Sequence, residues 1–372
     1  MKNRNTNSAP LSIGLDLGDK KSRYCVMEAQ GRMISKRRHT EPEEKILSEG
    51  SVSMTKTALK RCFSRFPGAT VIMEAGTHSA WVSEFLGSLV DEVVVANPHE
   101  VARKFLSKTK KTDKSDARTL AQLGLGSRSF LAPIKHRSRD SQLDLTLIRS
   151  RDALLKVRTE LINHTRSVVK GFGERLPSCT PGAFGKRARL ELERLPEFHD
   201  ALLPLLENIT RITEQIKEYD KKVERLCLQK YPETKVLMQI PGVGFLTALA
   251  YVLTLEDPKR FRKSRKVGAF LGMVPRQYQS GDASPQLRIT KAGNEHLRRL
   301  LVMSAHYILG HFGTDSALRR HGERIVAAGG KAAKKRAVIA VARKLSVVLH
   351  RLWTTGEQYE PFPHSSQKRK AS

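Results

Sequence analysis

The N-terminal third of the chain carries a strand pattern that restricts it to a mixed α/β sheet. Apolar residues alternate over Leu11–Asp16, ahead of the turn signal G-D-K-K. Two more strands are expected at Tyr24–Met27 and Met33–Ser35, around the segment A-Q-G-R. Helices near Lys56–Phe66 and at Ser79–Leu89 precede the strands A-T-V-I-M-E-A and E-V-V-V-A-N. The order β-β-β-α-β-α-β predicts a sheet whose strands run parallel after an initial meander.

Long helices are expected in the middle of the chain. Between Ser138 and Tyr231, apolar residues recur at helical spacing in two stretches, which a Gly/Pro-rich interruption from Gly171 to Gly185 separates. An antiparallel hairpin or a dimerising coiled coil explains this pattern, and a helical spacer packed only within its own chain explains it equally well. The two apolar stripes consist of Leu143, Leu147, Leu154, Leu155, Val157, Leu161 and Ile162, and of Leu206, Ile209, Ile212, Ile216, Tyr219 and Val223.

The last third of the chain begins near Val236 and contains further basic helices, the last of which spans residues 331–353. The predicted fold is therefore α/β plus all-α. We expect an α/β domain at 1–135 and a helical spacer and dimerisation region at 136–234. A mainly helical domain follows at 235–360, and a disordered basic tail is expected at 361–372.

The charge of the chain points to a polyanionic partner. Lys and Arg number 67 against 37 Asp and Glu, which gives a formal net charge of +30. Apolar runs such as Phe245 to Leu253 are shorter than the ~18–20 residues that span a bilayer, so nucleic acid is favoured over a membrane. The polar N-terminus lacks the apolar core of a secretion signal, and a cytoplasmic location is expected. The four cysteines are too dispersed to predict a zinc site or a disulfide framework.

Two acidic residues end apolar strands, where a carboxylate does not contribute to packing. Asp16 ends the first strand, and Glu74 follows V-I-M in the fourth. Because the ends of neighbouring strands meet at one edge of a sheet, the two carboxylates are expected to face each other. A plain turn role before glycine is the alternative for Asp16. Glu74 has no comparable structural explanation.

Asp113 and Asp116 are three residues apart, so both lie on one face of a helix if it has begun by then. Asp113 has an alternative explanation as an acid favoured by the dipole at a helix N-terminus. Four acids in one place repel one another unless divalent cations lie between them, and oxygen ligands suit Mg²⁺ or Mn²⁺. Two such ions about 4 Å apart are a known device for attack on a phosphodiester.

The segments I-G-L-D-L-G, V-I-M-E-A and K-T-D-K-S-D-A together resemble the D-E-D-D signature of insertion-sequence transposases of the IS110 type. The first domain of that family resembles a RuvC-like Holliday-junction resolvase with a ribonuclease-H-like fold. The resemblance implies that Asp16, Glu74, Asp113 and Asp116 form a tetrad that binds Mg²⁺, with Mn²⁺ as the second choice of metal.

The C-terminal third adds to the resemblance. In I-P-G-V-G-F-L-T-A-L-A, Gly242 and Gly244 allow a tight hairpin that brings backbone N–H groups to a phosphate, as in a helix-hairpin-helix element. An ordinary helix start with Pro241 in the first turn is the alternative. The following segments, through I-T-K-A-G-N-E-H-L-R-R-L-L, are similar to the family's transposase domain.

Ser280 aligns with the residue that the family uses as its nucleophile, and Gly281 gives the backbone freedom around it. The loop S-G-D-A-S-P-Q-L-R departs from the S-G-G of the family, which leaves Ser284 as a second choice. Basic residues nearby are predicted to neutralise phosphates, although each also fits a solvated surface charge. They are Arg276, Arg288, Lys291, Arg298 and Arg299.

The resemblance implies strand exchange on donor and target DNA through a 5′-phosphoserine link, with Ser280 and the tetrad meeting across subunits of a dimer that becomes a tetramer. It also implies a structured bridge RNA as a partner and a nucleoid-associated place in a prokaryotic cytoplasm. A site-specific DNA invertase of the same family is one alternative. A structure-selective metal nuclease or a non-catalytic DNA-binding protein, in which Ser280 has no chemical role, is the other.

Overall fold

The computed structural model describes residues 10–36, 39–98, 113–126, 131–276 and 287–363. The chain forms two compact units, Met1–Arg137 and Ser138–Ser372. The first is a mixed α/β unit and the second is helical, as the alternation of the N-terminal third and the helical periodicity of the remainder predict.

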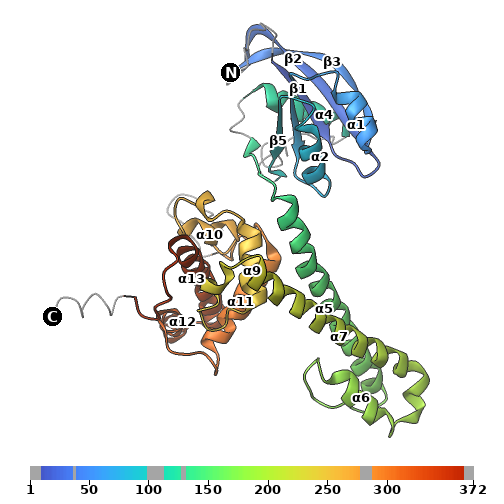
Figure 1. The fold of residues 1–372 in the computed structure, drawn as a ribbon, viewed down its shortest axis with the longest axis vertical. Helices are drawn as coiled ribbons and strands as arrows, with labels where there is room; N and C mark the ends of the chain where they lie inside the picture. Colours follow the sequence, from blue (N-terminus) through green and yellow to red (C-terminus); the bar gives the residue numbers. More distant parts are fainter. Residues whose placement is uncertain (1–9, 37–38, 99–112, 127–130, 277–286, 364–372) are drawn as a thin grey trace, which may run out of the picture. The chain divides into compact units, whose positions relative to one another are not determined.

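The first unit is built on one five-stranded sheet with the order β3-β2-β1-β4-β5 (Figure 1). β1 pairs antiparallel with β2 and parallel with β4, and β5 pairs parallel with β4. The predicted change from a meander to parallel strands is therefore confirmed. The strands are β1 (Leu11–Asp16), β2 (Lys21–Lys36), β3 (His39–Ser53), β4 (Thr70–Glu74) and β5 (Glu92–Ala96).

Helices cover both faces of this sheet. On one face, the odd-numbered residues of β1 and β4 form an apolar core with α1 (Lys56–Phe63) and α2 (Ser79–Leu86). On the other face, Ile72 of β4 and residues of β2 and β5 pack against α4 (Asp113–Leu125). Because side chains alternate along a strand, even-numbered residues of β1 and β4 belong to the α4 side.

The structure corrects one strand prediction. Met33–Ser35 is not a separate strand but the second half of β2, which continues through A-Q-G-R with an irregular register between Gln30 and Met33. The third strand is β3, which the sequence pattern missed. β3 lies at the edge of the sheet, where a strand does not need alternating apolar residues. Pro42 is tolerated there, because a residue of an edge strand can lack a backbone N–H group.

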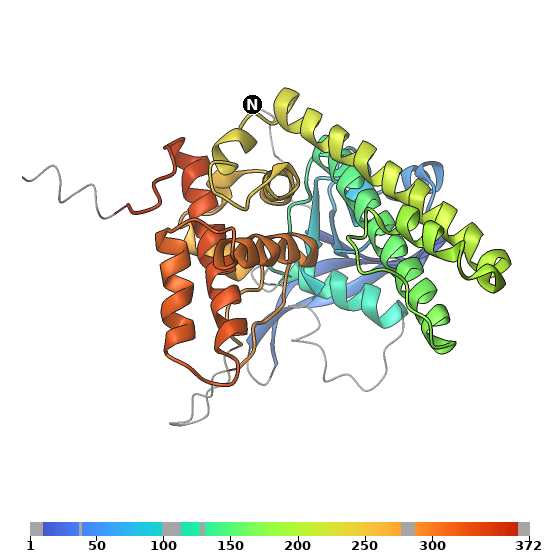
Figure 2. The same cartoon turned by 90° about the horizontal axis from the view of Figure 1, so that it is seen from below.

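The second unit contains two long helices, α5 (Arg139–Gly171) and α7 (His199–Gln229), which lie side by side (Figure 2). Arg151 Nε donates to Asp220 Oδ1 at 2.5 Å, and Arg158 Nη1 donates to Thr213 Oγ1 at 3.4 Å. Residue numbers that increase along α5 thus lie opposite residue numbers that decrease along α7, so the two helices are antiparallel. Between them lie α6 (Phe184–Leu192) and the short η2 (Pro196–Phe198), whose apolar residues close a small core at this end of the pair.

The predicted stripe of α7 is largely buried, whereas the stripe of α5 differs from the prediction. On α7, Leu206, Ile209, Ile216 and Val223 are buried. On α5, Ile162 is buried as predicted, but Leu143 and Val157 are exposed, and Leu145 and Ile148, which lie outside the predicted stripe, are buried. The apolar residues of α5 lie all around the helix, so their spacing alone could not identify the buried face.

The remaining helices pack around α9, which is buried along its length and whose Tyr251 hydroxyl donates to Ser346 O at 2.6 Å. Leu145 and Ile148 of α5 belong to the same core. None of the helices in the described ranges is both long and apolar enough to span a bilayer. The helices are α8 (Thr234–Leu237), α9 (Phe245–Leu255), η3 (Pro258–Arg260), α10 (Arg265–Phe270), α11 (Glu295–Leu309), α12 (Ala317–Ala327) and α13 (Ala333–Thr355).

The chain is still packed where the disordered tail was predicted to begin. The backbone N–H of Ala317 donates to Pro361 O at 2.8 Å, and the Arg320 guanidinium lies over the Phe362 ring at 4.5 Å from its centroid. Pro361 and Phe362 thus contact α12, inside the range where the tail was expected to begin. Residues 364–372 lie outside the described part of the chain.

A buried carboxylate connects α5 with α11. Asp152 is 9% exposed and accepts a hydrogen bond from Arg299, while Lys156 Nζ and His296 Nδ1 lie 3.4 and 3.6 Å from its Oδ2. Burial alone would raise the pKa of Asp152, but the hydrogen bond and charge of Arg299 lower it. The ion pair therefore fixes α11 on the long helix.

We expect Gly14→Ala to destabilise the first unit by about 1–3 kcal/mol, because a Cβ at Gly14 would collide with backbone atoms of Ala117 and Ala121 in α4. Urea denaturation followed by circular dichroism measures the loss. Gly68→Ala is the matched control, since a Cβ there meets nothing within 4 Å. Equal stability of the two variants would contradict this packing.

We expect Asp152→Asn to lower the free energy of unfolding of the second unit by about 1–2 kcal/mol near neutral pH. The pKa of Asp152 lies below its ordinary value of 3.8 in the folded chain. The contribution is thus complete above that value and is lost as pH falls through the lower, folded pKa. Urea denaturation at several pH values checks this, with the exposed Glu218→Gln as control. A difference that stays constant into acid would sink the assignment.

Candidate active site

Asp16 and Glu74 end adjacent parallel strands. Leu15 of β1 lies beside Met73 of β4 in the sheet register, so the next residue of each strand is Asp16 and Glu74. Both share the parity of the residues that face α4, and both are half-buried. The sequence prediction that these acids meet at one edge is consistent with this register.

Helix α4 runs antiparallel to β1 across this face. A Cβ on Gly14 would meet Ala117 and Ala121, whereas a Cβ on Gly124 would meet Ser12. As α4 proceeds, it therefore moves from the carboxyl end of β1 toward its start. The first turn of α4, which holds Asp113 and Asp116, lies toward the end of β1 where Asp16 stands.

The sides of α4 separate its acids from its bases. Asp116 is one turn before Leu120, and Leu120 packs in one cluster with Ile72 of β4 and Val94 of β5. Lys114 and Arg118 form the opposite flank and pair with Glu49 of β3. The acidic flank thus belongs to the side of β4, the strand that ends in Glu74.

The sheet register and the direction of α4 bring the backbones of these acids toward the same end of β1 and β4, and carboxylate oxygens are ligands that suit a hard divalent cation. Within the described ranges, no group of three or more acidic, histidine or cysteine side chains is closed tightly enough to hold a metal ion. Backbone placement and donor type fit the cation, while the side chains do not converge on a common point.

Glu49 is a site residue that the sequence reasoning missed. Its carboxylate accepts from Arg118 Nε at 2.9 Å and lies 3.1 Å from Lys114 Nζ. The hydrogen bond from Arg118 is the main cause that lowers the pKa of Glu49. Glu49 lies in a polar edge strand, so the sequence around it did not indicate this role. The contact fixes the beginning of α4, where Asp113 and Asp116 stand.

His78 was missed as well. Its Nε2 lies 3.4 Å from Asp19 Oδ1, and Trp81 Nε1 donates to its Nδ1 at 3.3 Å. Because Nδ1 accepts, a neutral imidazole carries its proton on Nε2, toward Asp19. Asp19 follows β1 and His78 precedes α2, so this pair lies in loops that leave the same sheet edge as Asp16 and Glu74. The only signal for His78 in the sequence was that it follows soon after the strand-end acid Glu74.

Ser280, Gly281 and Ser284 lie outside the described residues, so the placement of the predicted nucleophile stays a prediction. The chain on both sides of this segment is described. Pro275 and Ile289 form an antiparallel bridge, and the Arg276 N–H donates to Arg288 O at 2.9 Å. Both predicted arginines are exposed where the chain leaves and re-enters the described structure.

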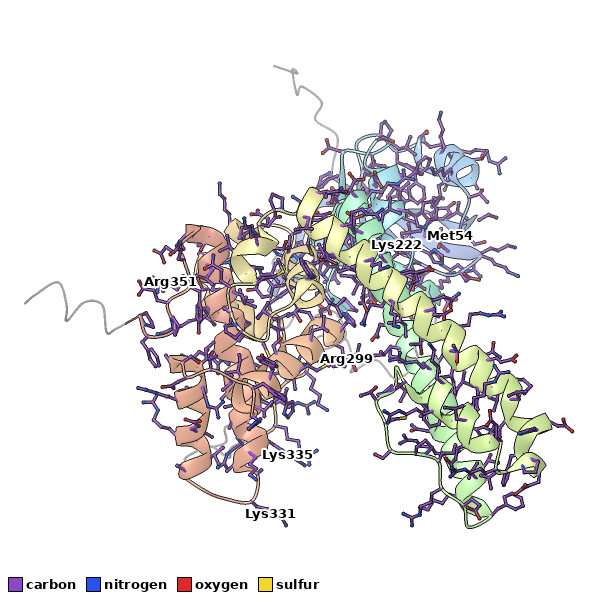
Figure 3. All side chains as sticks on the ribbon, turned by 60° about the horizontal axis from the view of Figure 1, so that its bottom comes forward. Met54, Lys222, Arg299, Lys331, Lys335 and Arg351 are labelled. Atoms are coloured by element: carbon purple, nitrogen blue, oxygen red, sulfur yellow. The ribbon has the colours of Figure 1, made fainter. Side chains whose placement is uncertain are left out.

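The other cations that were predicted to bind phosphate differ in their contacts with the rest of the chain. Lys291 is exposed, at a left-handed φ of 57° that is costly for any residue but glycine. Arg298 Nη1 donates to Leu271 O at 3.0 Å, and Arg299 pairs with Asp152. The last two therefore hold the structure, and a role in binding nucleic acid stays a prediction for all of them. In Figure 3, Lys331 and Lys335 project near the turn between α12 and α13, cations that the sequence reasoning did not single out.

The glycines predicted to form a hairpin lie in the turn between α8 and α9. Gly242 has a φ of +91°, and a Cβ there would press against the Tyr307 ring. Gly244 precedes the first residue of α9 in extended conformation, is exposed, and has open space where a side chain would be. A close approach of a ligand to this backbone is sterically allowed.

Comparison with known proteins gives these features a family context. A family model described as a transposase of the IS116/IS110/IS902 family matches residues 234–322. A second model, for DEDD transposases of IS110 elements, matches residues 13–173, a range that contains all four predicted acids. The two models fall on the helical second unit and on the sheet with α5.

Similar proteins extend the match over nearly the whole chain. The transposase for insertion sequence element IS1111A of Coxiella burnetii is 26% identical over 356 residues, which cover 93% of this chain and 90% of the relative. The transposase for element IS1328 of Yersinia enterocolitica is 28% identical over 331 residues, 85% of this chain and 91% of the relative. Taken with the two family models, these similarities show that the chain belongs to the IS110 family of insertion-sequence transposases.

Proposed function

We propose that this transposase exchanges DNA strands through a covalent phosphoserine, with Ser280 as the nucleophile and Asp16, Glu74, Asp113 and Asp116 as ligands of Mg²⁺ or Mn²⁺. The observation that supports the proposal is the parallel register in which β1 and β4 end in Asp16 and Glu74, together with the direction of α4, whose first turn lies toward the end of β1. The order β3-β2-β1-β4-β5 supports the ribonuclease-H-like fold that the resemblance implies.

The proposed reaction balances without an external reductant or oxidant. The Ser280 hydroxyl oxygen bonds to a backbone phosphorus of DNA, the bond from that phosphorus to the 3′ oxygen breaks, and the 3′ oxygen leaves as a hydroxyl with the proton that serine gives up. A 3′ hydroxyl of another strand then attacks the phosphoserine and returns the proton to Ser280. Breaking and joining thus conserve the number of phosphodiester bonds.

The residues of this chain have separable roles in that scheme. Bound divalent ions supply charge neutralisation at the phosphate and leaving oxygen. The four carboxylates would hold those ions. Glu49 positions the first turn of α4 through Lys114 and Arg118. Arg276 and Arg288 flank the serine segment and are suited to bind the attacked phosphate.

The partners are proposed on the same basis. Donor and target DNA follow from the family, and the excess of cations also suits a structured bridge RNA. The pair α5–α7 is proposed to dimerise the chain, with tetramer formation on DNA and the serine and tetrad meeting across subunits. The division at 135, 234 and 360 into catalytic domain, spacer and DNA-binding domain belongs to the same proposal, as does action at the nucleoid.

Two alternatives keep part of this proposal. A DNA invertase of the same family would use the same residues but reverse a segment instead of moving it. A plasmid carrying one marked segment separates these outcomes, since inversion keeps the segment and excision removes it. A metal nuclease would need the four carboxylates but not the serine.

We expect Asp16→Asn to reduce strand exchange about a hundredfold or more, because a lost carboxylate weakens the charge stabilisation of the transferred phosphate. Calorimetric titration with Mn²⁺ should show weaker binding as a second readout. Asp91→Asn is the matched control, since Asp91 precedes β5 at the opposite end of the sheet. Undiminished exchange and Mn²⁺ binding in Asp16→Asn would dismiss the metal-site assignment.

We expect Ser280→Ala to abolish the covalent protein–DNA adduct and strand exchange, because no hydroxyl oxygen remains to form the phosphoester. Denaturing electrophoresis with end-labelled DNA detects the adduct. Ser284→Ala should retain both, which makes it the control for the neighbouring choice. If Ser280→Ala still cuts DNA, the nuclease alternative replaces the covalent one.

A further inference from the structure

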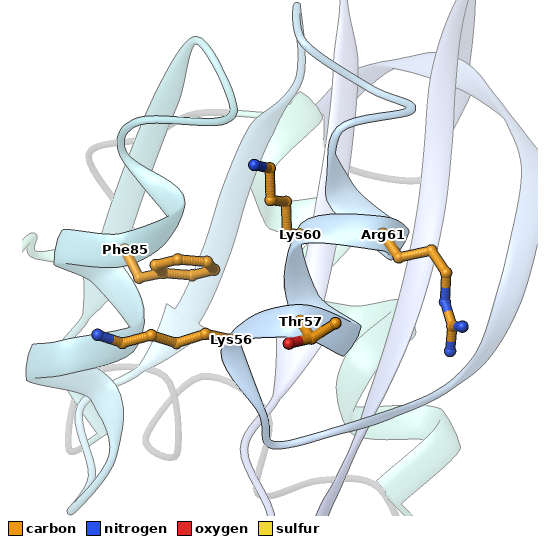
Figure 4. A pocket seen from close by; sticks show the side chains of 5 residues that line it. All are labelled: Lys56, Thr57, Lys60, Arg61 and Phe85. Carbon is orange, nitrogen blue, oxygen red and sulfur yellow. The ribbon is translucent and has the colours of Figure 1, made fainter.

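A basic depression lies between α1 and α2, on the sheet face opposite α4. It encloses about 390 Å³ and is lined by Lys56, Thr57, Lys60 and Arg61 of α1 and by Phe85 of α2. In Figure 4 the Phe85 ring points from α2 toward α1, between the Lys56 and Lys60 side chains. The depression therefore combines three cations with one accessible aromatic ring.

Helix stability does not account for all three cations. Lys60 and Arg61 stand in the last turn of α1, where the helix dipole favours positive charge. Lys56 stands in the first turn, where the dipole disfavours it, and no acid stands in that turn. The Nζ atom of Lys56 lies 6.0 Å from the centroid of the Phe85 ring. Helix stability therefore does not explain the presence of Lys56 at this position, whereas a role in the depression does.

In the part of the chain that the structure describes, these cations lack the carboxylate partners that several other basic residues have. Lys114, Arg118, Arg151 and Arg299 each pair with a carboxylate. Within the described residues, Lys56, Lys60 and Arg61 have no such ion pair. Their charges are therefore available to an external anion, and the three lie within two turns of one helix.

We propose that this depression binds an unpaired DNA strand, with a base stacked on Phe85 and consecutive phosphates held by the α1 cations. An aromatic ring among cations matches the chemistry of single strands, whose bases are free to stack, better than that of a duplex, whose bases are already stacked. DNA is favoured because the family acts on DNA and strand exchange requires local unpairing. The site does not depend on Ser280 or on the tetrad.

The test uses the full chain and an oligothymidylate of about 12 nucleotides that carries 5-iododeoxyuridine as a photo-crosslinking base. Since the chain carries a net charge of +30 and binds anions elsewhere, crosslinks mapped by mass spectrometry to α1 and α2 peptides read out this depression alone. Crosslink yield against oligonucleotide concentration gives an apparent Kd for the site. Repeating it at several salt concentrations gives the number of phosphate contacts.

Two variants separate charge from stacking. Lys56→Gln combined with Lys60→Gln should lower the salt slope of the apparent Kd by about 1.4, the value for two phosphate contacts on a single strand. Phe85→Leu keeps an apolar side chain against the core and should weaken binding about 5- to 150-fold with an unchanged slope. Lys45→Gln, which removes one exposed charge from β3, is the matched control and should change neither. Circular dichroism verifies that each variant is folded.

Three results would overturn the proposal. The first is crosslinking elsewhere on the chain but never to α1 or α2. The second is an unchanged apparent Kd in Phe85→Leu, which would mean that no base stacks on the ring. The third is occupation by an oligouridylate but not by the DNA strand, which would make the ligand an RNA. Because recombination assays are not involved, these results are independent of the proposed serine chemistry.

Discussion

The close approach of α4 to β1 is the contact on which the candidate active site depends. Gly14 on the strand and Ala117, Ala121 and Gly124 on the helix leave no side-chain bulk between the two backbones. A larger residue would lift the helix and carry Asp113 and Asp116 away from the strand that ends in Asp16. Small residues at the contact thus set the distance between acids that are a hundred positions apart in sequence.

The same helix also divides charge by side. Its basic flank is neutralised by Glu49 on the edge strand, and its acidic flank is directed to the side of β4. Had Lys114 pointed toward Asp113 and Asp116, an internal ion pair would have competed with any cation. Glu49 therefore acts on the site through the basic flank of α4.

Much of this arrangement was accessible from the sequence, and the limits have identifiable causes. The strand-end position of Asp16 and Glu74 and the spacing of Asp113 and Asp116 predicted the acidic corner, because parallel register and helical periodicity are local rules. The edge strand β3 and its Glu49 were missed, since an edge strand needs no apolar alternation. The buried face of α5 was predicted only in part, because its apolar residues surround the helix. The partners of Arg298 and Arg299 depend on contacts between segments distant in sequence, which no local pattern encodes.

The excess of positive charge, finally, is not one uniform property of this chain. Arg299 neutralises a buried carboxylate and Arg298 donates to backbone carbonyls, so both side chains stabilise the fold. Lys56, Lys60 and Arg61 lie on an exposed helix flank and have no carboxylate partner among the described residues. A nucleic acid competes only for cations of the second kind, since displacing a buried ion pair leaves an unpaired charge behind. Net charge thus identifies the class of partner, while the ion pairs of the folded chain decide where that partner can bind.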